Sequence, residues 1–112
     1  MKTYYIVTQA DTDKNGHIQY ATGVFSDGDG NTELYTNGEE AREAIAQDVA
    51  NMVDVRGSLD FAINDEDGFT ATSWKEAYEY VMKNMKPEAG QYVLLTWSDL
   101  SERTYTINAI QI

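Results

Sequence analysis

Three segments in the first third of the chain favour strands. Thr3 to Gln9 and His17 to Phe25 are rich in Tyr, Ile, Val and Thr, and a short third segment follows at Thr32 to Thr36. The stretches between them, Ala10 to Gly16 and Ser26 to Asn31, are rich in Asp, Asn and Gly, which favour turns. We therefore predict three consecutive strands arranged as an antiparallel meander.

Two amphipathic helices are predicted in the rest of the chain. In the first, apolar residues recur at helical spacing from Ala41 to Val53. Either Thr36 or Asn37 can begin its capping box, and Gly57 is a natural stop. In the second, Ser73 is the expected cap. Its apolar stripe, which we expect to lie in the core, contains Trp74, Ala77, Tyr78, Val81, Met82 and Met85.

The remaining segments complete the predicted sheet. Ser58 to Ile63 alternates between apolar and polar residues, and Phe69 to Thr72 is a weaker strand candidate. Gln91 to Trp97 and Arg103 to Ile112 form an expected terminal hairpin. The predicted order is β-β-β-α-β-(β)-α-β-β within a single domain, residues 1–112. We expect an α+β fold, in which two helices pack on one face of an antiparallel sheet of five to six strands.

Charge adds the strongest functional indication. The chain has 112 residues and a formal net charge of -11, with 19 acidic and eight basic residues. Twelve of the acids lie between Asp27 and Asp67, where only Arg42 and Arg56 oppose them. Repulsion among like charges destabilises a compact state, so we interpret this block as functional or as a source of solubility. The negative balance disfavours direct binding to nucleic acid or anionic lipid.

The chain lacks the residues that several classes of function require. The chain contains no cysteine, which excludes disulfides, thiolate nucleophiles and cysteine-based zinc sites. His17 is the only histidine, no nucleophile, phosphate-binding or dinucleotide-binding motif is present, and we expect no enzymatic activity. No long apolar run suggests a signal peptide or membrane span, and we expect a cytoplasmic protein.

One segment matches part of a calcium loop. The sequence from Asp11 to Ile18, with Asp11, Asp13 and Asn15 as possible oxygen ligands, follows the first half of the D-x-D-x-N-G pattern. Thr22 stands where the bidentate Glu of such a loop belongs, and the flanking segments favour strands. We therefore interpret the segment as a hairpin turn and keep weak calcium binding as the alternative.

The acidic face of the first helix is the preferred binding site. The predicted partner-binding residues lie on this helix and in the acidic loops: Glu39, Glu40, Glu43, Asp54, Asp27, Asp29, Asp65, Glu66 and Asp67. Residues three and four apart on a helix lie about 5–6 Å from each other, so we expect a ribbon of negative charge. Such a ribbon could replace nucleic-acid phosphates in a basic groove.

In size and charge the chain resembles small phage-encoded inhibitors, such as anti-CRISPR and antirestriction proteins, and acidic immunity proteins that block nucleases. This resemblance implies an inhibitor that mimics the charge of DNA and binds the basic surface of a nuclease or of a CRISPR or restriction effector. The alternatives are a calcium-binding domain that uses the Asp- and Gly-rich loops and an accessory structural domain with an acidic surface.

Overall fold

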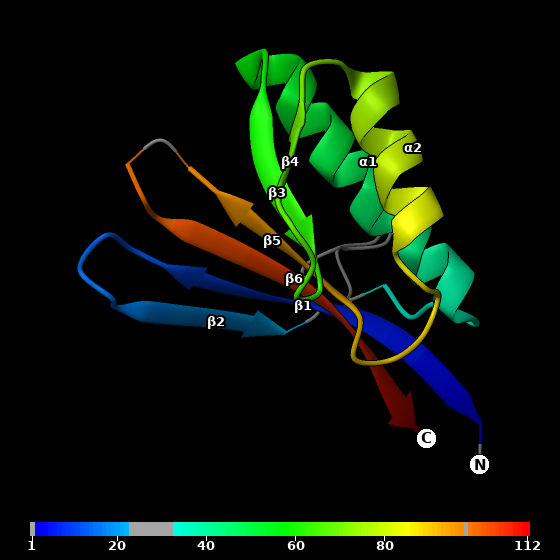
Figure 1. Ribbon diagram of the computed structural model, residues 1–112. Coiled ribbons are helices and arrows are strands. Elements are labelled where there is room, and N and C mark those ends of the chain that lie inside the picture. The colour runs from blue at the N-terminus through cyan, green and yellow to red at the C-terminus, as the bar shows by residue number, and fades with distance from the viewer. Residues whose placement is uncertain (1, 23–32, 98) are drawn as a thin grey trace.

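The computed structural model describes residues 2–22, 33–97 and 99–112, which form six strands and two helices (Figure 1). In chain order these elements are β1 (Thr3–Thr12), β2 (Ile18–Thr22), α1 (Gly38–Arg56), β3 (Leu59–Ile63), β4 (Phe69–Ala71), α2 (Trp74–Asn84), β5 (Tyr92–Thr96) and β6 (Glu102–Gln111). Neither helix in these ranges combines the length and the apolar character needed to cross a membrane.

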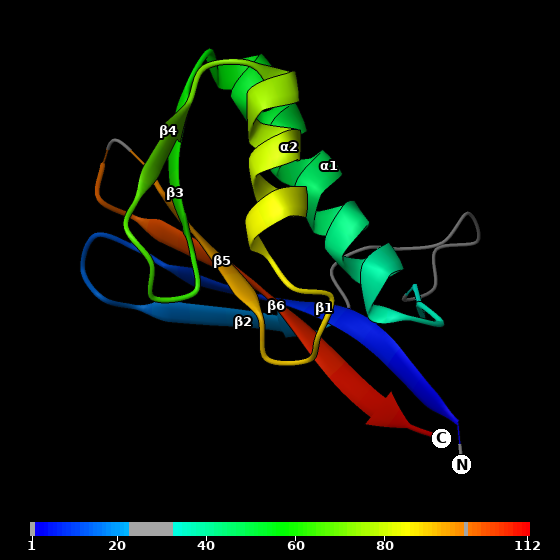
Figure 2. The same ribbon diagram turned by 45° about the vertical axis from the view of Figure 1, so that its right-hand side comes forward.

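All six strands belong to one antiparallel sheet with the spatial order β2-β1-β6-β5-β3-β4. Figures 1 and 2 show both helices on the same side of this sheet. No described element covers the opposite face. The predicted fold class is confirmed, and so is the weaker strand candidate, which forms β4.

The longest strand pair joins the two ends of the described chain. β1 and β6 share ten residue pairs, from Thr3 with Gln111 to Thr12 with Glu102. The first two strands of the predicted meander pair as predicted, but the third does not, because Tyr35 contacts β1 and not β2. Long-range pairing is favoured here because it places two buried side chains, Val7 and Ile107, opposite each other.

The predicted third strand is reduced to an isolated bridge. Tyr35 exchanges two backbone hydrogen bonds with Tyr5, at 2.8 and 2.9 Å. It therefore pairs with the same side of β1 as β2 does, beyond the end of β2. Residue 32 of the segment predicted at 32–36, and the end of the strand predicted at 17–25, lie outside the described residues.

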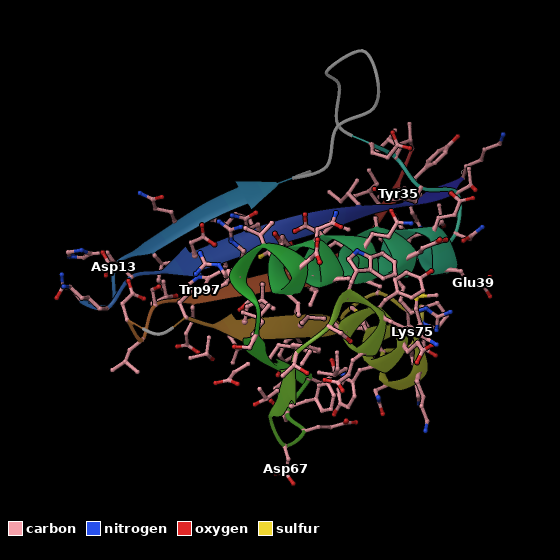
Figure 3. The ribbon with its side chains drawn as sticks, turned by 90° about the horizontal axis from the view of Figure 1, so that it is seen from above. Asp13, Tyr35, Glu39, Asp67, Lys75 and Trp97 are labelled. Carbon is pink, nitrogen blue, oxygen red and sulfur yellow. The ribbon has the colours of Figure 1, made fainter. Side chains whose placement is uncertain are left out.

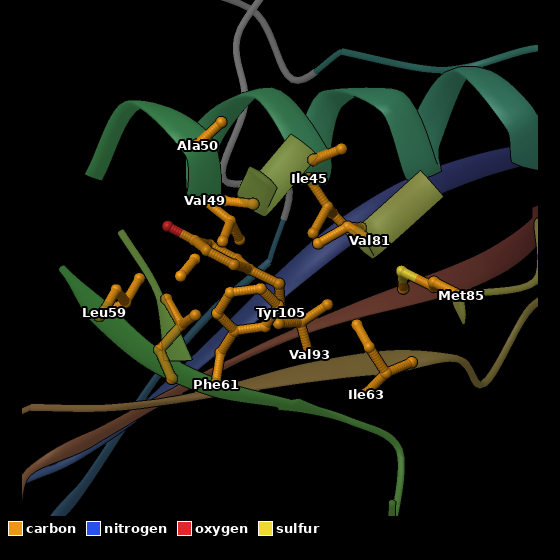
Figure 4. Close-up of a cluster of buried hydrophobic side chains, with 14 of the residues drawn as sticks. Ile45, Val49, Ala50, Leu59, Phe61, Ile63, Val81, Met85, Val93 and Tyr105 are labelled. Carbon is orange, nitrogen blue, oxygen red and sulfur yellow. The ribbon is translucent and has the colours of Figure 1, made fainter. Parts of the chain in front are cut away.

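The core lies between the helices and the covered face of the sheet (Figure 4). Alternate residues of the strands point into it, including Phe61 of β3, Val93 of β5 and Ile107 of β6. Ile45 and Val49 of α1 meet them from above. α1 buries seven residues and α2 only two. The two helices pack against each other, and α2 also contacts β4.

Local sequence signals set the helix ends. Asn37 caps α1 by accepting a hydrogen bond from the Glu40 backbone N–H at 2.9 Å, so Asn37 is the cap rather than Thr36. Gly57 follows the last residue of the helix at φ 86°, a conformation that favours glycine. Ser73 caps α2 and accepts from the Glu76 N–H at 3.2 Å, as predicted.

The prediction that the whole stripe of α2 lies in the core is wrong at its first residue. Trp74 is 38% exposed, and its ring stacks on Tyr78 with the centroids 5.0 Å apart. Its indole N–H donates to the side-chain oxygen of Asn51 on α1 at 2.8 Å. Trp74 therefore ties the start of α2 to α1 at the surface of the protein and not in its core.

Candidate functional site

Acidic side chains surround a hollow beside the first turns of α1. Its lining residues are Glu33, Tyr35, Glu40, Glu43, Ala44 and Gln47, and its volume is about 370 Å³. We call this feature the α1 hollow. Glu39 and Glu40 lie in the first turn, where the positive end of the helix dipole stabilises carboxylates. The hollow thus joins three acids from two separate segments of the chain.

Tyr35 forms one wall of the α1 hollow. The bridge to Tyr5 fixes its backbone against the edge of the sheet. Burial raises the pKa of Tyr35 to about 12, and the negative charges of Glu33 and Glu40 add to this effect. At neutral pH the side chain is therefore a protonated phenol that presents an uncharged aromatic surface beside carboxylates.

The raised pKa of Tyr35 gives a testable prediction. The folded state favours the protonated phenol, so the stability that Tyr35 contributes is present below pH 10 and is lost as the pH rises through about 12. Wild type and Tyr35→Phe are titrated by ultraviolet absorbance, and the second curve is subtracted from the first. The difference should show the ionisation of one tyrosine with a midpoint near pH 12. A difference spectrum with a midpoint near 10 would contradict this assignment.

Glu43 is held at the rim of the α1 hollow by neighbours from both helices. Its Oε1 accepts hydrogen bonds from the Tyr78 hydroxyl at 3.2 Å and from the Gln47 side-chain amide at 3.3 Å. The pKa of Tyr78 is raised, first by desolvation and then by the charge of Glu43. These neutral donors orient the carboxylate without cancelling its charge.

Arg42 and Arg56, the two basic residues between positions 27 and 67, form no ion pair with a described acid. Within the described ranges there are three ion pairs, which join Asp13 to His17, Glu79 to Lys75 and Asp11 to Arg103. Arg42 instead donates from Nη1 to the Met85 carbonyl at 3.1 Å. The Arg56 guanidinium lies over the Trp97 ring, 4.2 Å from its centroid.

The other predicted binding residues do not complete one ribbon. Asp54 lies near the far end of α1, eleven residues and therefore about 16 Å along the axis from Glu43. Glu66 and Asp67 are exposed in the turn between β3 and β4, and Figure 3 shows Asp67 well apart from Glu39. Asp65 precedes them and accepts a hydrogen bond from the Tyr92 hydroxyl at 2.5 Å. The described acids thus form separate groups.

Asp27 and Asp29 lie outside the described residues. Two further acids of the central block hold the fold together. Asp48 of α1 accepts a hydrogen bond from the hydroxyl of Tyr105 at 2.5 Å, which links the helix to β6. Asp60 on β3 accepts one from the Thr70 hydroxyl at 2.6 Å and so joins β3 to β4. These two carboxylates therefore connect elements of the fold.

The segment that resembles a calcium loop is the hairpin turn between β1 and β2. Asp13 Oδ1 accepts from the backbone N–H groups of His17 and Asn15 at 2.9 and 2.8 Å, which lowers the pKa of Asp13. Both oxygens of Asp11 bind Arg103, at 2.8 and 3.1 Å. In the described part of the chain, no three His, Cys, Asp or Glu residues gather in a way that could hold a metal ion. Calcium binding stays an untested prediction.

Sequence reasoning missed two residues of the α1 hollow, Glu33 and Tyr35. Both lie in the segment that was assigned to a third strand, where residues two apart share a face. That alternation could have placed the Glu33 carboxylate beside the Tyr35 ring. It could not show that the segment would return to the edge of β1 and lie against α1.

The α1 hollow suits positively charged side chains. Its carboxylates can accept charge-assisted hydrogen bonds from Arg or Lys, and the Tyr35 ring offers a surface on which a guanidinium can stack. Comparisons with protein-family models, with curated proteins and with solved structures found no match to this chain. The α1 hollow is therefore interpreted from its geometry and charge.

Proposed function

We propose that this protein is a binding protein, not an enzyme, that inhibits a nucleic-acid enzyme by occupying its basic surface. The partner would be a nuclease or a CRISPR or restriction effector whose Lys and Arg side chains normally contact phosphates. The observation that carries this proposal is the group of carboxylates in the α1 hollow, none of which forms an ion pair with a described cation.

The arrangement of these carboxylates supports a mimic of nucleic-acid charge. Glu40 and Glu43 lie three residues apart on α1 and are therefore about 5–6 Å from each other. Glu33 adds a third charge from outside the helix, across the hollow. A groove that binds closely spaced phosphates would attract the same pattern of negative charge.

Because the described acids lie in separate groups, we propose a contact surface that contains only one of these groups. The α1 hollow and the neighbouring Glu39 form its centre, and Tyr35 is its aromatic anchor. The β3–β4 turn, with Glu66 and Asp67, belongs to another acidic group (Figure 3). We therefore assign the close contacts to the α1 hollow. The turn adds to the long-range field that speeds association.

Charge reversal tests this proposal. A bait of the wild-type protein should capture a basic nucleic-acid-binding protein from a bacterial lysate at low salt and release it at high salt. Against that purified partner, the double variant Glu40→Lys with Glu43→Lys should weaken binding about a hundredfold, because each change sets like charges against each other. Isothermal titration calorimetry measures both affinities.

The matched control carries the same change of net charge in the other acidic group. Glu66→Lys with Asp67→Lys should mainly slow association and leave most of the affinity intact. Equal losses in both double variants would indicate that only net charge matters. Intact binding of the Glu40→Lys, Glu43→Lys variant would refute the assignment to the α1 hollow.

A further inference from the structure

The two edges of the sheet differ in how well they are protected. An unpaired edge strand exposes backbone N–H and C=O groups that can pair with another chain, and proteins usually block such edges with charge, short strands or covering elements. β4 has only three residues, lies next to the acidic turn that contains Asp67, and stacks Phe69 on Tyr80 of α2 at 3.9 Å. β4 is therefore a protected edge.

β2, at the other edge, carries no charge of its own and is covered by no described element. Its five residues, Ile18 to Thr22, include no charged residue and no proline. Figure 1 shows β2 at the edge of the sheet that lies farther from both helices. Ile18 and Tyr20 are 70% and 66% exposed, and residues two apart on a strand share a face. Among the described residues, nothing pairs with the outer side of β2.

The hydrogen-bond pattern shows which groups point outward. The Asp13 N–H donates to the His17 carbonyl at 2.9 Å, so residues 17, 19 and 21 direct their backbone groups toward β1. The N–H and C=O groups of Ile18 and Tyr20 therefore point away from the sheet. Both polar groups of Tyr20 lie at the centre of this free edge.

We propose that β2 pairs in antiparallel fashion with β2 of a second copy of this chain and joins two sheets into one. A two-fold axis at Tyr20 would pair Tyr20 with its symmetry mate, so that each tyrosine donates its N–H to the other's carbonyl. The same axis would pair residue 18 with residue 22 and residue 19 with residue 21.

Charge favours a second copy as the occupant. Residues 1–22 contain two lysines and two aspartates, so this part of the chain is formally neutral within a protein of net charge -11. Two copies can meet along β2 with little repulsion, whereas contact through the α1 hollow would bring carboxylates together.

Sedimentation equilibrium across a concentration series tests the proposal. The wild type should reach twice the monomer mass, and added salt should preserve or strengthen the dimer, because salt screens the repulsion between two acidic chains. Tyr20→Pro removes the outward N–H without taking a donor from the β1 ladder, and proline is tolerated at such edge positions. It should weaken the dimer at least about tenfold, because two intermolecular hydrogen bonds are lost.

A second variant and a control keep the result interpretable. Tyr20→Lys retains the N–H but sets two positive charges against each other across the two-fold axis, and it should also weaken the dimer. Thr70→Lys adds the same charge to the protected edge strand β4 and should leave the dimer unchanged. Circular dichroism checks that each variant is folded.

Amide hydrogen exchange provides a readout that is independent of mass. The Tyr20 N–H should exchange more slowly as the protein concentration rises, whereas the Thr70 N–H should not respond. A wild type that stays monomeric at every concentration would overturn the proposal. So would a dimer that Tyr20→Pro and Tyr20→Lys leave intact. Neither result bears on the salt-sensitive binding proposed for the α1 hollow.

Discussion

Replacing Phe61 by alanine is expected to lower the free energy of unfolding by about 3–5 kcal/mol, the usual cost of removing a buried aromatic side chain. Phe61 is 2% exposed and lies at the centre of the core, between the sheet and the helices (Figure 4). Its ring meets those of Phe69 and Tyr80 edge to face, with centroids 5.7 and 5.6 Å away. The substitution therefore removes buried apolar surface and the contacts between rings, and it leaves a cavity in the core.

Urea denaturation measures this effect if unfolding is two-state. Val55→Ala is the matched control, because Val55 is 86% exposed on α1 and alanine has the higher helix propensity. The control should change stability by less than about 0.5 kcal/mol. A Phe61→Ala variant as stable as this control would mean that the β3 strand does not pack against the helices as the structure shows.

Gly38→Ala is expected to destabilise the protein by about 2 kcal/mol or more, although alanine is the better helix former by about 1 kcal/mol. A Cβ atom on Gly38 would lie 2.0 Å from the Pro87 carbonyl oxygen and 2.6 Å from its carbon. Both of these are backbone atoms, so no side-chain rotation can relieve the overlap. Either the first turn of α1 or the segment after α2 would have to move.

Gly68→Ala is the control for this prediction. Nothing lies within 4 Å of a Cβ at Gly68, so this change should be neutral or slightly stabilising. Urea denaturation of both variants gives the comparison. Because helix propensity and steric overlap predict opposite signs at Gly38, a variant that gains stability there would show that the close approach between α1 and Pro87 is absent.

Local signals predicted much of the fold because they act within a few residues. Ser73 and Gly57 mark helix ends through their own backbone and side-chain geometry. The alternation in Leu59 to Ile63 predicts a strand with one buried face. The sequence leaves the choice between Thr36 and Asn37 as the cap of α1 open, and in the structure the Asn37 side chain makes the capping hydrogen bond.

The candidate site was predicted only in part. The sequence located the acids of α1 and the shortage of basic residues around them, because helical spacing places Glu40 and Glu43 on one side. It did not show that Arg42 would turn to the Met85 carbonyl or that Arg56 would stack on Trp97. These long side chains reach residues more than 40 positions away in the sequence.

By itself the sequence determined the fold class, most of the strands and helices and the excess of negative charge, because hydrophobic period, caps and composition are local properties. Only the tertiary structure decided that β6 lies beside β1, that Tyr35 returns to the sheet edge, and that Trp74 stays at the surface. Among the described residues, it also separated the acids into groups and left the outer side of β2 unpaired. These features depend on which distant segments bury the most apolar surface together, and that competition is settled across the whole molecule.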